Sequence, residues 1–545
     1  MRIAAAAALL LVICGAARAA EPIDLTLDVD LREAPRRVFH ARMRIPARPG
    51  SFALVYPKWI PGEHGPNGPV GDLVGLVFVS RGQRLAWRRD PLDLHRLIVE
   101  VPQGASEVEA QLDFISQPPS TSGFSEGASA TAHLAVLSWH QVLLYPDGAA
   151  ARDARMRATV RVPARWKIAT ALPVEGAPGE TTRFGAVSLE QLVDSPVLTG
   201  EHLHEIPLGP PGGPPHFLDI AGESEDLLHV DAELKSRWDA LVVQTRLLFG
   251  ARHYGGYRFL LTLSDSVAHF GLEHHQSSDN RVLERVLLDP DLRLSRLAGL
   301  LPHEFTHSWN GKYRRPAGLA TPDFQKPMQD DLLWVYEGLT TYLGNVLAAR
   351  SGLYTPDQYR EGLAFSADFL QQRRGRTWRP LSDTAVSAPV LYGAREDWDA
   401  WRRDVDFYDE GDLIWLEADT LIREKTSGAR SLDDFCQLFF GGKDGPPEVR
   451  PYTLDDVVAA LAQIAPLDWR GFFQSRVFSV QPDAPLAGIE RSGWKLAYAP
   501  EATEWFRANE KAKRLVDLRA SIGLLVDDES ERDKLKILDV IPGSA

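Results

Sequence analysis

Short segments in which apolar and polar residues alternate dominate the chain from residue 21 to about residue 210. Ile23 to Val29, Phe52 to Tyr56 and Ala158 to Val162 are examples, and clusters of Gly, Pro and Asp separate them. A period of two residues turns one side of each segment towards a core, which predicts half-buried strands. We therefore expect a β-sandwich-like N-terminal domain over residues 20–210. The Pro- and Gly-rich run 207–215 is expected to be a linker.

The pattern changes at about residue 216, where apolar residues recur with helical spacing. The expected elements are helices at 228–249, 291–309 and 331–350, a further helix from Thr355, and strands at 257–263 and 270–278. Pro356 and Gln358 supply the first turn and the capping box of the helix at Thr355. This predicts a mostly helical domain over residues 216–480, so the chain as a whole is multidomain α+β. Residues 481–545 form a linker and two strand-like segments, 521–526 and 535–541.

The composition is that of an ordinary globular protein, with 545 residues of which 44% are apolar and 25% charged. The net charge is -14 and Lys and Arg form no basic stripe. Nucleic acid is therefore not an expected partner, because binding it requires clustered positive charge. No segment of the mature chain is apolar over the roughly 20 residues that span a membrane. The sequence leaves the oligomeric state open.

The first nineteen residues have the pattern of a signal peptide. Arg2 supplies a positive charge, residues 3–14 are apolar, and Ala17-Arg18-Ala19 fits a cleavage site. The alternative is a buried N-terminal helix. Cleavage near Ala19 predicts a secreted or periplasmic protein and leaves Cys436 as the one cysteine. A single cysteine makes no internal disulfide, and the apolar spacing around Cys436 indicates a buried side chain.

The most informative motif is His303-Glu304-Phe305-Thr306-His307, which is H-E-x-x-H on a predicted helix. Residues four apart share one helical face, so His303 and His307 can bind one Zn²⁺. Glu304 then points towards the open coordination position, where it can act as the general base.

A catalytic zinc needs a third protein ligand, and no third histidine follows at the spacing seen in extended motifs of this kind. Glu337 is the best candidate, because it places a carboxylate in the otherwise apolar run Trp334 to Leu339. The alternative for Glu337 is a salt-bridged helix residue. Asp330 and Asp331 are weaker candidates, since acidic residues at a helix start also serve as caps.

Two further segments carry residues that suit peptide hydrolysis. Glu273, on the strand that begins at Phe270, could bind a free α-amino group, or it could be an exposed strand residue. Tyr408 precedes a helix and could stabilise an oxyanion, or it could be a packed aromatic side chain. His274 and His275 allow a second metal site, although histidines cluster for many reasons.

These motifs resemble the glycyl aminopeptidase family, family sixty-one of the metallopeptidases. The resemblance rests on HEFTHSWNGKYRRPAGL from His303 and WVYEGLTTYLG from Trp334, and on three shorter stretches. The shorter stretches are Trp59-Ile60-Pro61-Gly62, Leu192 to Val197, and Phe270-Gly271-Leu272-Glu273-His274. Members of the family are thermolysin-like gluzincins with an N-terminal β domain and a C-terminal PDZ domain. The strands after residue 520 and the ending IPGSA resemble the opening of such a PDZ domain.

The resemblance implies a zinc aminopeptidase that acts on peptides with a free N-terminus. His303, His307 and Glu337 would bind zinc and Glu304 would be the base. Gly271 and Glu273 would contact the substrate, and Tyr408 would be the catalytic tyrosine, although Glu410 replaces the lysine of the related Y-x-K-G motif. Phe270 replaces the first glycine of G-G-L-E-H, so a preference for glycine does not follow. The alternatives are a zinc endopeptidase on the same scaffold, a non-catalytic periplasmic peptide-binding protein and a sugar-binding β-sandwich.

Overall fold

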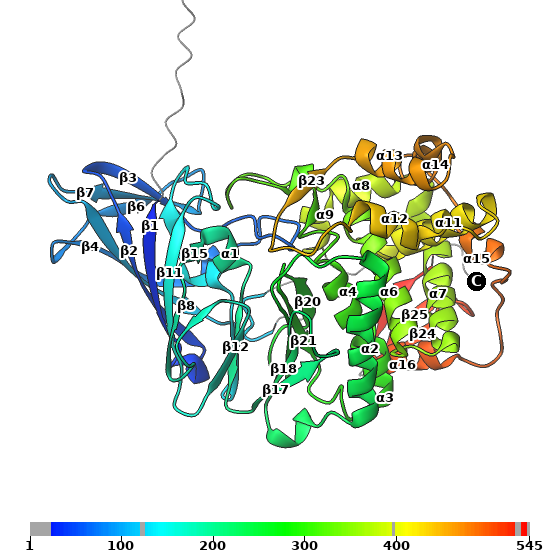
Figure 1. Ribbon diagram of the computed structural model, residues 1–545, viewed down its shortest axis with the longest axis horizontal. Coiled ribbons are helices and arrows are strands. Elements are labelled where there is room, and N and C mark those ends of the chain that lie inside the picture. Colours follow the sequence, from blue (N-terminus) through cyan, green and yellow to red (C-terminus); the bar gives the residue numbers. More distant parts are fainter. Residues whose placement is uncertain (1–22, 120–125, 395–397, 529–535, 542–545) are drawn as a thin grey trace, which may run out of the picture.

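The computed structural model describes residues 23–119, 126–394, 398–528 and 536–541, in a mixed α+β fold with a multi-sheet β region followed by a largely helical region (Figure 1). The predicted signal peptide and the ending PGSA lie outside the described residues. No described helix is both long enough and apolar enough to cross a membrane.

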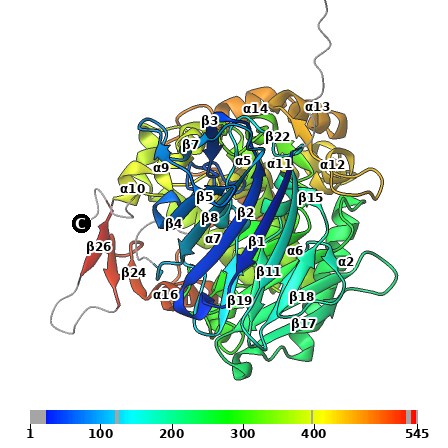
Figure 2. The same cartoon turned by 90° about the vertical axis from the view of Figure 1, so that its left-hand side faces the viewer.

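The β region is built on one large sheet. Its strands are β1 (Asp24–Asp30), β2 (Val38–Pro46), β4 (Leu73–Ser80), β5 (Gln83–Arg84), β8 (Glu107–Ile115), β11 (Arg155–Arg161), β13 (Val174–Glu175), β14 (Thr181–Phe184) and β15 (Val187–Ser188). They follow the order β13-β14-β11-β1-β2-β8-β4-β5, with β15 also paired to β11. Burial alternates along β1 and β2, as the sequence pattern predicts. Seen from its own end of the molecule, the sheet lies in front of the helical region (Figure 2).

Two smaller sheets complete this region. The first contains β3 (Gly50–Val55), β6 (Trp87–Arg89), β7 (Arg96–Val101) and β10 (Tyr145–Pro146), and the second contains β9 (Leu134–Leu137), β12 (Lys167–Thr170) and β16 (Val197–Gly200). The first of these shares one hydrophobic core with the large sheet. Phe324, from the helical region, inserts into the same core. The β region is therefore packed against the rest of the chain.

A mixed sheet links the two regions. Its strands are β17 (Leu203–Leu208), β18 (His216–Gly222), β19 (Tyr257–Leu263), β20 (Phe270–Glu273) and β21 (Ser277–Val282). The order is β17-β18-β19-β21-β20, so β20 is an edge strand, as expected. The interpretation of residues 207–215 as a linker is wrong, because 207 and 208 belong to β17, which pairs with β18, and 209–215 form the hairpin loop between the two strands. A small core of side chains from β9, β16, β18 and β19 joins this sheet to the β region.

Helices form most of the remainder. They are α1 (Leu189–Val193), α2 (Ala232–Phe249), α3 (Pro290–Arg296), α4 (Leu300–Thr306), α5 (Leu333–Tyr336), α6 (Gly338–Ser351), α7 (Pro356–Gln371), α8 (Leu381–Val386), α9 (Ala388–Leu391), α10 (Asp399–Arg402), α11 (Asp409–Lys425), α12 (Leu432–Phe439), α13 (Leu454–Ile464), α14 (Trp469–Arg476), α15 (Ala487–Arg491) and α16 (Glu504–Lys513). The capping box at Thr355 is present, and Cys436 is buried in α12. Two predicted helices are each divided in two, at residues 297–299 and at Glu337.

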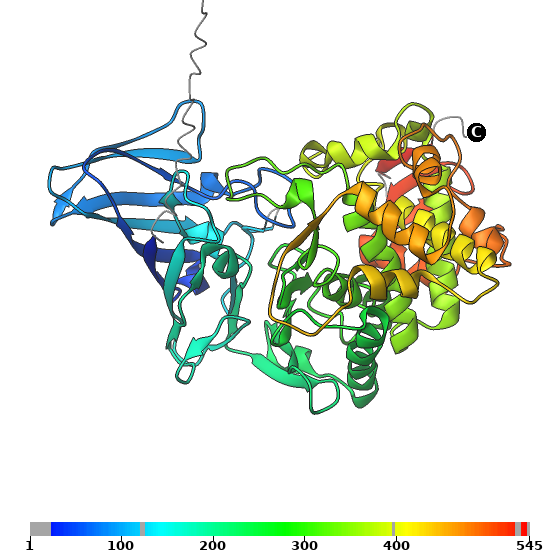
Figure 3. The same cartoon turned by 45° about the horizontal axis from the view of Figure 1, so that its top comes forward.

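Short strands occupy the remaining positions. They are β22 (Arg314–Pro316), β23 (Arg450–Tyr452), β24 (Leu515–Leu518), β25 (Leu524–Asp527) and β26 (Ile537–Val540). The loop before β23 runs back along the boundary between the two regions (Figure 3). The last three strands form a sheet of their own at the side of the molecule (Figure 2), so the strand-like character of the C-terminal segment is confirmed.

Two glycines allow α6 and α11 to cross at close range. A Cβ on Gly411 would lie 2.5 Å from Cα of Gly338, and a Cβ on Gly338 would lie 2.8 Å from Cα of Gly411. Backbone, which cannot move aside cheaply, is the neighbour in both cases. The contact matters for the site because Glu337 precedes α6 and Tyr408 precedes α11.

We predict that Gly411→Ala destabilises the protein by about 1–3 kcal/mol, the usual cost of overpacking, despite the higher helix propensity of alanine. Thermal unfolding should show a midpoint several degrees lower than that of the wild type. Gly179→Ala is the matched control, because a Cβ there meets nothing within 4 Å. An unchanged midpoint for Gly411→Ala would mean that the helix pair tolerates wider spacing.

Candidate active site

The imidazoles of His303 and His307 converge at the end of α4. His303 lies in the last turn of the helix and His307 is its C-terminal cap. Their Nε2 atoms are 3.1 Å apart. This approach follows from the four-residue spacing, which places both side chains on one helical face.

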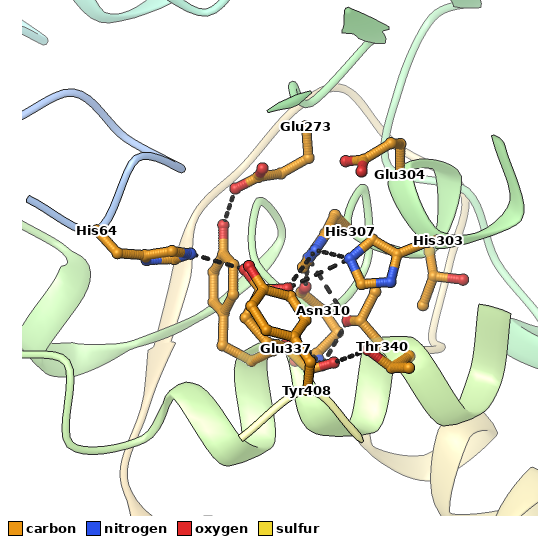
Figure 4. Close-up of polar contacts among 12 residues, drawn as sticks. His64, Glu273, His303, Glu304, His307, Asn310, Glu337, Thr340 and Tyr408 are labelled. Carbon is orange, nitrogen blue, oxygen red and sulfur yellow. Dashed lines mark hydrogen bonds and ion pairs between the residues drawn. The ribbon is translucent and has the colours of Figure 1, made fainter. Parts of the chain in front are cut away.

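The carboxylate of Glu337 meets both imidazoles at the junction of α5 and α6. Its Oε2 lies 3.3 Å from Nε2 of His303 and 3.1 Å from Nε2 of His307 (Figure 4). The residue is only 2% exposed. Burial opposes its ionisation, but the charge of His307 and the hydrogen bonds from the imidazoles hold the pKa of Glu337 well below its ordinary value. The three side chains therefore present one nitrogen or oxygen atom each to a common point.

Close packing of α4 against α6 brings these atoms together. A Cβ on Gly344 of α6 would lie 3.0 Å from Cα of His303. A larger residue at position 344 would therefore push the helix that carries His303 away from the helix that Glu337 precedes.

A second set of hydrogen bonds fixes the orientation of His307. Its Nδ1 lies 2.9 Å from the carbonyl oxygen of Asn310, which leaves Nε2 for a ligand. The amide of Asn310 donates in turn to the carbonyl of Val335 and to Oγ1 of Thr340. The loop after α4 is thereby tied to the α5-α6 junction.

The β region supplies a residue that the sequence did not indicate. His64 donates from Nε2 to Oε1 of Glu337 over 2.7 Å and is 1% exposed. Its φ of 51° lies in the left-handed region, which is uncommon for residues other than glycine. The loop is anchored by the N–H groups of Lys58 and Trp59, which both donate to the carbonyl of Phe324. The only available signal was position, two residues after the Trp59 to Gly62 motif.

Glu304 lies beside the convergence point and is almost fully buried. Burial raises the pKa of its carboxyl to about 8, against the opposing charge of His303. Gly271 of β20 faces it, and a Cβ at position 271 would overlap the Glu304 carboxylate and approach Leu300 Cδ1 to 2.8 Å. Gly271 therefore makes room for Glu304.

Glu273 lies two residues further along β20, on the same side of the ligand atoms as Glu304 in Figure 4. The hydroxyl of Tyr336 donates to Oε1 of Glu273, and Nζ of Lys312 lies 4.0 Å from the same oxygen. Burial opposes ionisation, yet Lys312 and His307 lower the pKa of Glu273, so this buried carboxyl is held charged. The interpretation of Glu273 as an exposed strand residue is wrong, because it is 3% exposed.

Tyr408 packs beside His303, with ring centroids 6.1 Å apart. Its hydroxyl lies 2.5 Å from that of Tyr392, a second tyrosine that the sequence did not single out. Glu410, which replaces the expected lysine, points away into a buried ion-pair network with Arg376 and Arg403. The Glu410 carboxylate thus holds the start of α11 in place rather than contacting Tyr408.

The weaker candidates from the sequence lie elsewhere. Among the described residues, no contact joins Asp330 or Asp331 to either His303 or His307. His274 Nδ1 lies 3.4 Å from Asp194, and the N–H of His275 donates to the same carboxylate. These histidines line a cavity at the boundary of the two regions instead of joining the three ligand atoms.

An H-E-x-x-H helix with a buried carboxylate beside both histidines defines the chain as a peptidase. The chain belongs to the M61 glycyl aminopeptidase family: its family model matches residues 296–414, and that of the peptidase M61 N-terminal domain matches residues 26–201. A solved structure of an aminopeptidase N family protein from Idiomarina loihiensis superposes with a TM-score of 0.77. It is 19% identical and the match covers 95% of this chain and 86% of that one, a likeness of fold. No curated protein matches the chain by sequence.

Gly271→Ala should lower the kcat of peptide hydrolysis at least tenfold, because the added methyl group displaces the Glu304 carboxylate and a misplacement of about 1 Å can cost a hundredfold. Hydrolysis of an unblocked dipeptide by the purified variant measures the effect. Gly255→Ala is the control, since its Cβ would meet one atom, at 3.7 Å. If the Gly271 variant and the wild type had equal kcat values, the position that the Glu304 carboxylate takes beside Gly271 would not matter for hydrolysis.

Proposed function

We propose that the protein is a zinc-dependent aminopeptidase that removes residues from the N-terminus of peptides. The observation that carries the proposal is the triangle of ligand atoms from His303, His307 and Glu337, with edges of 3.1, 3.1 and 3.3 Å. Tetrahedral zinc with bonds of about 2.0–2.1 Å requires ligand atoms about 3.3–3.4 Å apart. Two imidazoles and one carboxylate also suit zinc chemically.

A zinc ion held by these three residues would supply a Lewis acid that polarises the scissile carbonyl and increases the acidity of water. Glu304 is the residue that accepts the proton of the attacking water and returns it to the leaving amine. Its burial favours this role, because a carboxyl with a raised pKa is a better proton acceptor. The hydroxyl of Tyr408, beside His303, would donate to the oxyanion that forms.

Glu273 determines which peptide bond of the substrate lies beside Glu304. A buried carboxylate on the edge strand β20 can accept hydrogen bonds from the free ammonium group of a peptide, so that the first peptide bond meets Glu304. Tyr336 donates a hydrogen bond to Oε1 of Glu273, and Lys312 forms an ion pair with the same oxygen. We therefore expect Oε2 to accept a hydrogen bond from the substrate ammonium group. An N-acetylated peptide has no ammonium and would leave this carboxylate without its partner.

The finer features of the family are part of the same proposal. We infer a thermolysin-like catalytic domain over residues 216–480 and a C-terminal segment that opens a PDZ-like unit. The pattern of residues 1–19 supports export to the periplasm or the medium.

The main test is a panel of free and N-acetylated short peptides offered to the wild type and to Glu304→Gln. We expect cleavage of the free peptides alone, one residue at a time, and a fall in kcat of at least about a thousandfold in the variant. Zinc content, measured on both proteins, should be unchanged. Cleavage of acetylated peptides at internal bonds would instead establish the endopeptidase, and a variant that is still active would remove Glu304 from its role.

His64 should act on zinc affinity through Glu337. We predict that His64→Leu weakens zinc binding about 10- to 100-fold, the usual effect of losing a hydrogen bond to a metal-ligating side chain. His64→Gln should recover part of the affinity, because the glutamine amide can donate from a similar position. Competition with a chromogenic chelator measures both, without reference to turnover.

His216→Leu is the matched control for the loss of a buried imidazole. His216 is 4% exposed, and its Nε2 lies 2.9 Å from the hydroxyl of Tyr254, while its ring packs on Phe305 rather than on a ligand residue. An equal loss of zinc affinity in both leucine variants would show a general effect of destabilisation and would contradict the role given to His64.

A further inference from the structure

A second group of buried side chains that could ligate a metal lies in the β region, and one of its members, Glu63, is the neighbour of His64 in the chain. Glu63, Glu126 and His140 come from three separate segments, and one ligand atom from each lies within 4.8 Å of the others. All three are at least 95% buried, with exposed fractions of 5%, 4% and 2%. Two carboxylates and an imidazole at such depth require compensating positive charge.

Hydrogen bonds account for only part of this group. Oε1 of Glu126 accepts from the hydroxyl of Ser138. Oε2 of Glu126 lies 3.1 Å from Nε2 of His140, yet neither atom has a hydrogen-bond partner of acceptable geometry. The carboxyls of Glu63 and Glu126 contact each other, and burial together with the charge of Glu126 raises the pKa of Glu63 well above its ordinary value. Although burial opposes it, the charges of His140 and Arg281 hold the pKa of Glu126 at about 2, so Glu63 is the carboxyl of the group whose negative charge lacks compensation.

Among the described residues, Arg281 is the guanidinium that approaches this group, and it already has an ion-pair partner. Arg281 is fully buried and pairs with Asp279 over 2.6 Å, whereas its distance to Oε1 of Glu126 is 3.8 Å. The charges of Arg281 and Asp279 cancel. Glu63 and Glu126 would together carry two negative charges, which one divalent cation balances.

An approach route for an ion is present. Glu126, Ser138 and His140 line a cavity of about 510 Å³ at the boundary between the β region and the catalytic region. His275, which lines the same cavity, also has a buried Nε2 atom with no hydrogen-bond partner. Two of the three side chains, those of Glu126 and His140, therefore border an open cavity rather than a sealed core.

We propose that Glu63, Glu126 and His140 bind a second divalent cation of the transition series, Zn²⁺ or Mn²⁺, at a site separate from His303, His307 and Glu337. Imidazole with two carboxylates suits these ions, whereas Ca²⁺ and Mg²⁺ prefer oxygen ligands alone. The ion replaces the proton that Glu63 and Glu126 must otherwise share.

The position of the group gives the ion a structural role. Glu63 directly precedes His64, whose Nε2 holds Oε1 of Glu337. A cation that fixes Glu63 against Glu126 and His140 also fixes the loop that brings His64 to the catalytic centre. Binding at this second site would therefore stabilise the contact between the β region and the metal ligands.

The test is the number of ions bound per chain. Bound metal is removed from the protein with a chelator, and the protein is then dialysed against Zn²⁺ or Mn²⁺. The amount of metal bound per chain is measured by inductively coupled plasma mass spectrometry. We expect two equivalents in the wild type, and one each in His140→Leu, Glu63→Gln and His307→Leu. Glu190→Gln should keep two, because Glu190 lines the same cavity but pairs with Arg152.

The outcomes separate this inference from the proposed function. A single equivalent in the wild type that His307→Leu removes and His140→Leu leaves would overturn the second site and show that the group holds a proton instead. An equivalent that only His140→Leu removes would support the second site and contradict the catalytic zinc. Thermal unfolding checks that each variant is folded. If His140→Leu does not fold, the metal contents of the wild type and of His307→Leu still test the second site. We expect two equivalents of metal in the wild type and one in His307→Leu.

Discussion

The carboxylate of Glu337 is buried against three imidazoles, and the surrounding structure depends on keeping it charged. An unpaired carboxylate at 2% exposure would be too costly to retain, so its partners must be held in place. His303 and His307 contact Oε2 of Glu337, and His64 donates a hydrogen bond to Oε1. The partners come from α4 and from the β region, so the site exists only when both have folded.

Close approach of the backbone is the second requirement. Gly344 lets α4 lie against α6, Gly338 and Gly411 let α6 cross α11, and Gly271 leaves room for Glu304. These glycines act by the absence of a side chain, since the neighbouring atoms belong to the backbone or to the Glu304 carboxylate. The geometry of the site is thus a consequence of how near the helices and the edge strand can come.

Several elements could be read from the chain because their information is local. The alternation in β1 and β11, the strand β19 and the capping box at Thr355 are all found as the pattern predicts. Boundaries that depend on packing were not predictable. The helix expected at 331–350 is interrupted at Glu337, just before Gly338, although the backbone of Glu337 itself stays in the helical region. The run 207–215 has a linker's composition, but pairing of β17 with β18 makes 209–215 a hairpin loop.

The same division applies to the site. The sequence by itself determined the donor types and their local order: two histidines on one helical face, a glutamate between them, and a carboxylate in an apolar segment thirty residues on. Helical periodicity suffices for this, because it fixes which side chains share a face. Only the tertiary structure decided that His64, 273 residues from Glu337 along the chain, completes the site, and that Glu63, Glu126 and His140 meet. Such contacts arise from packing between sheets and loops, which leaves no periodic trace in the sequence.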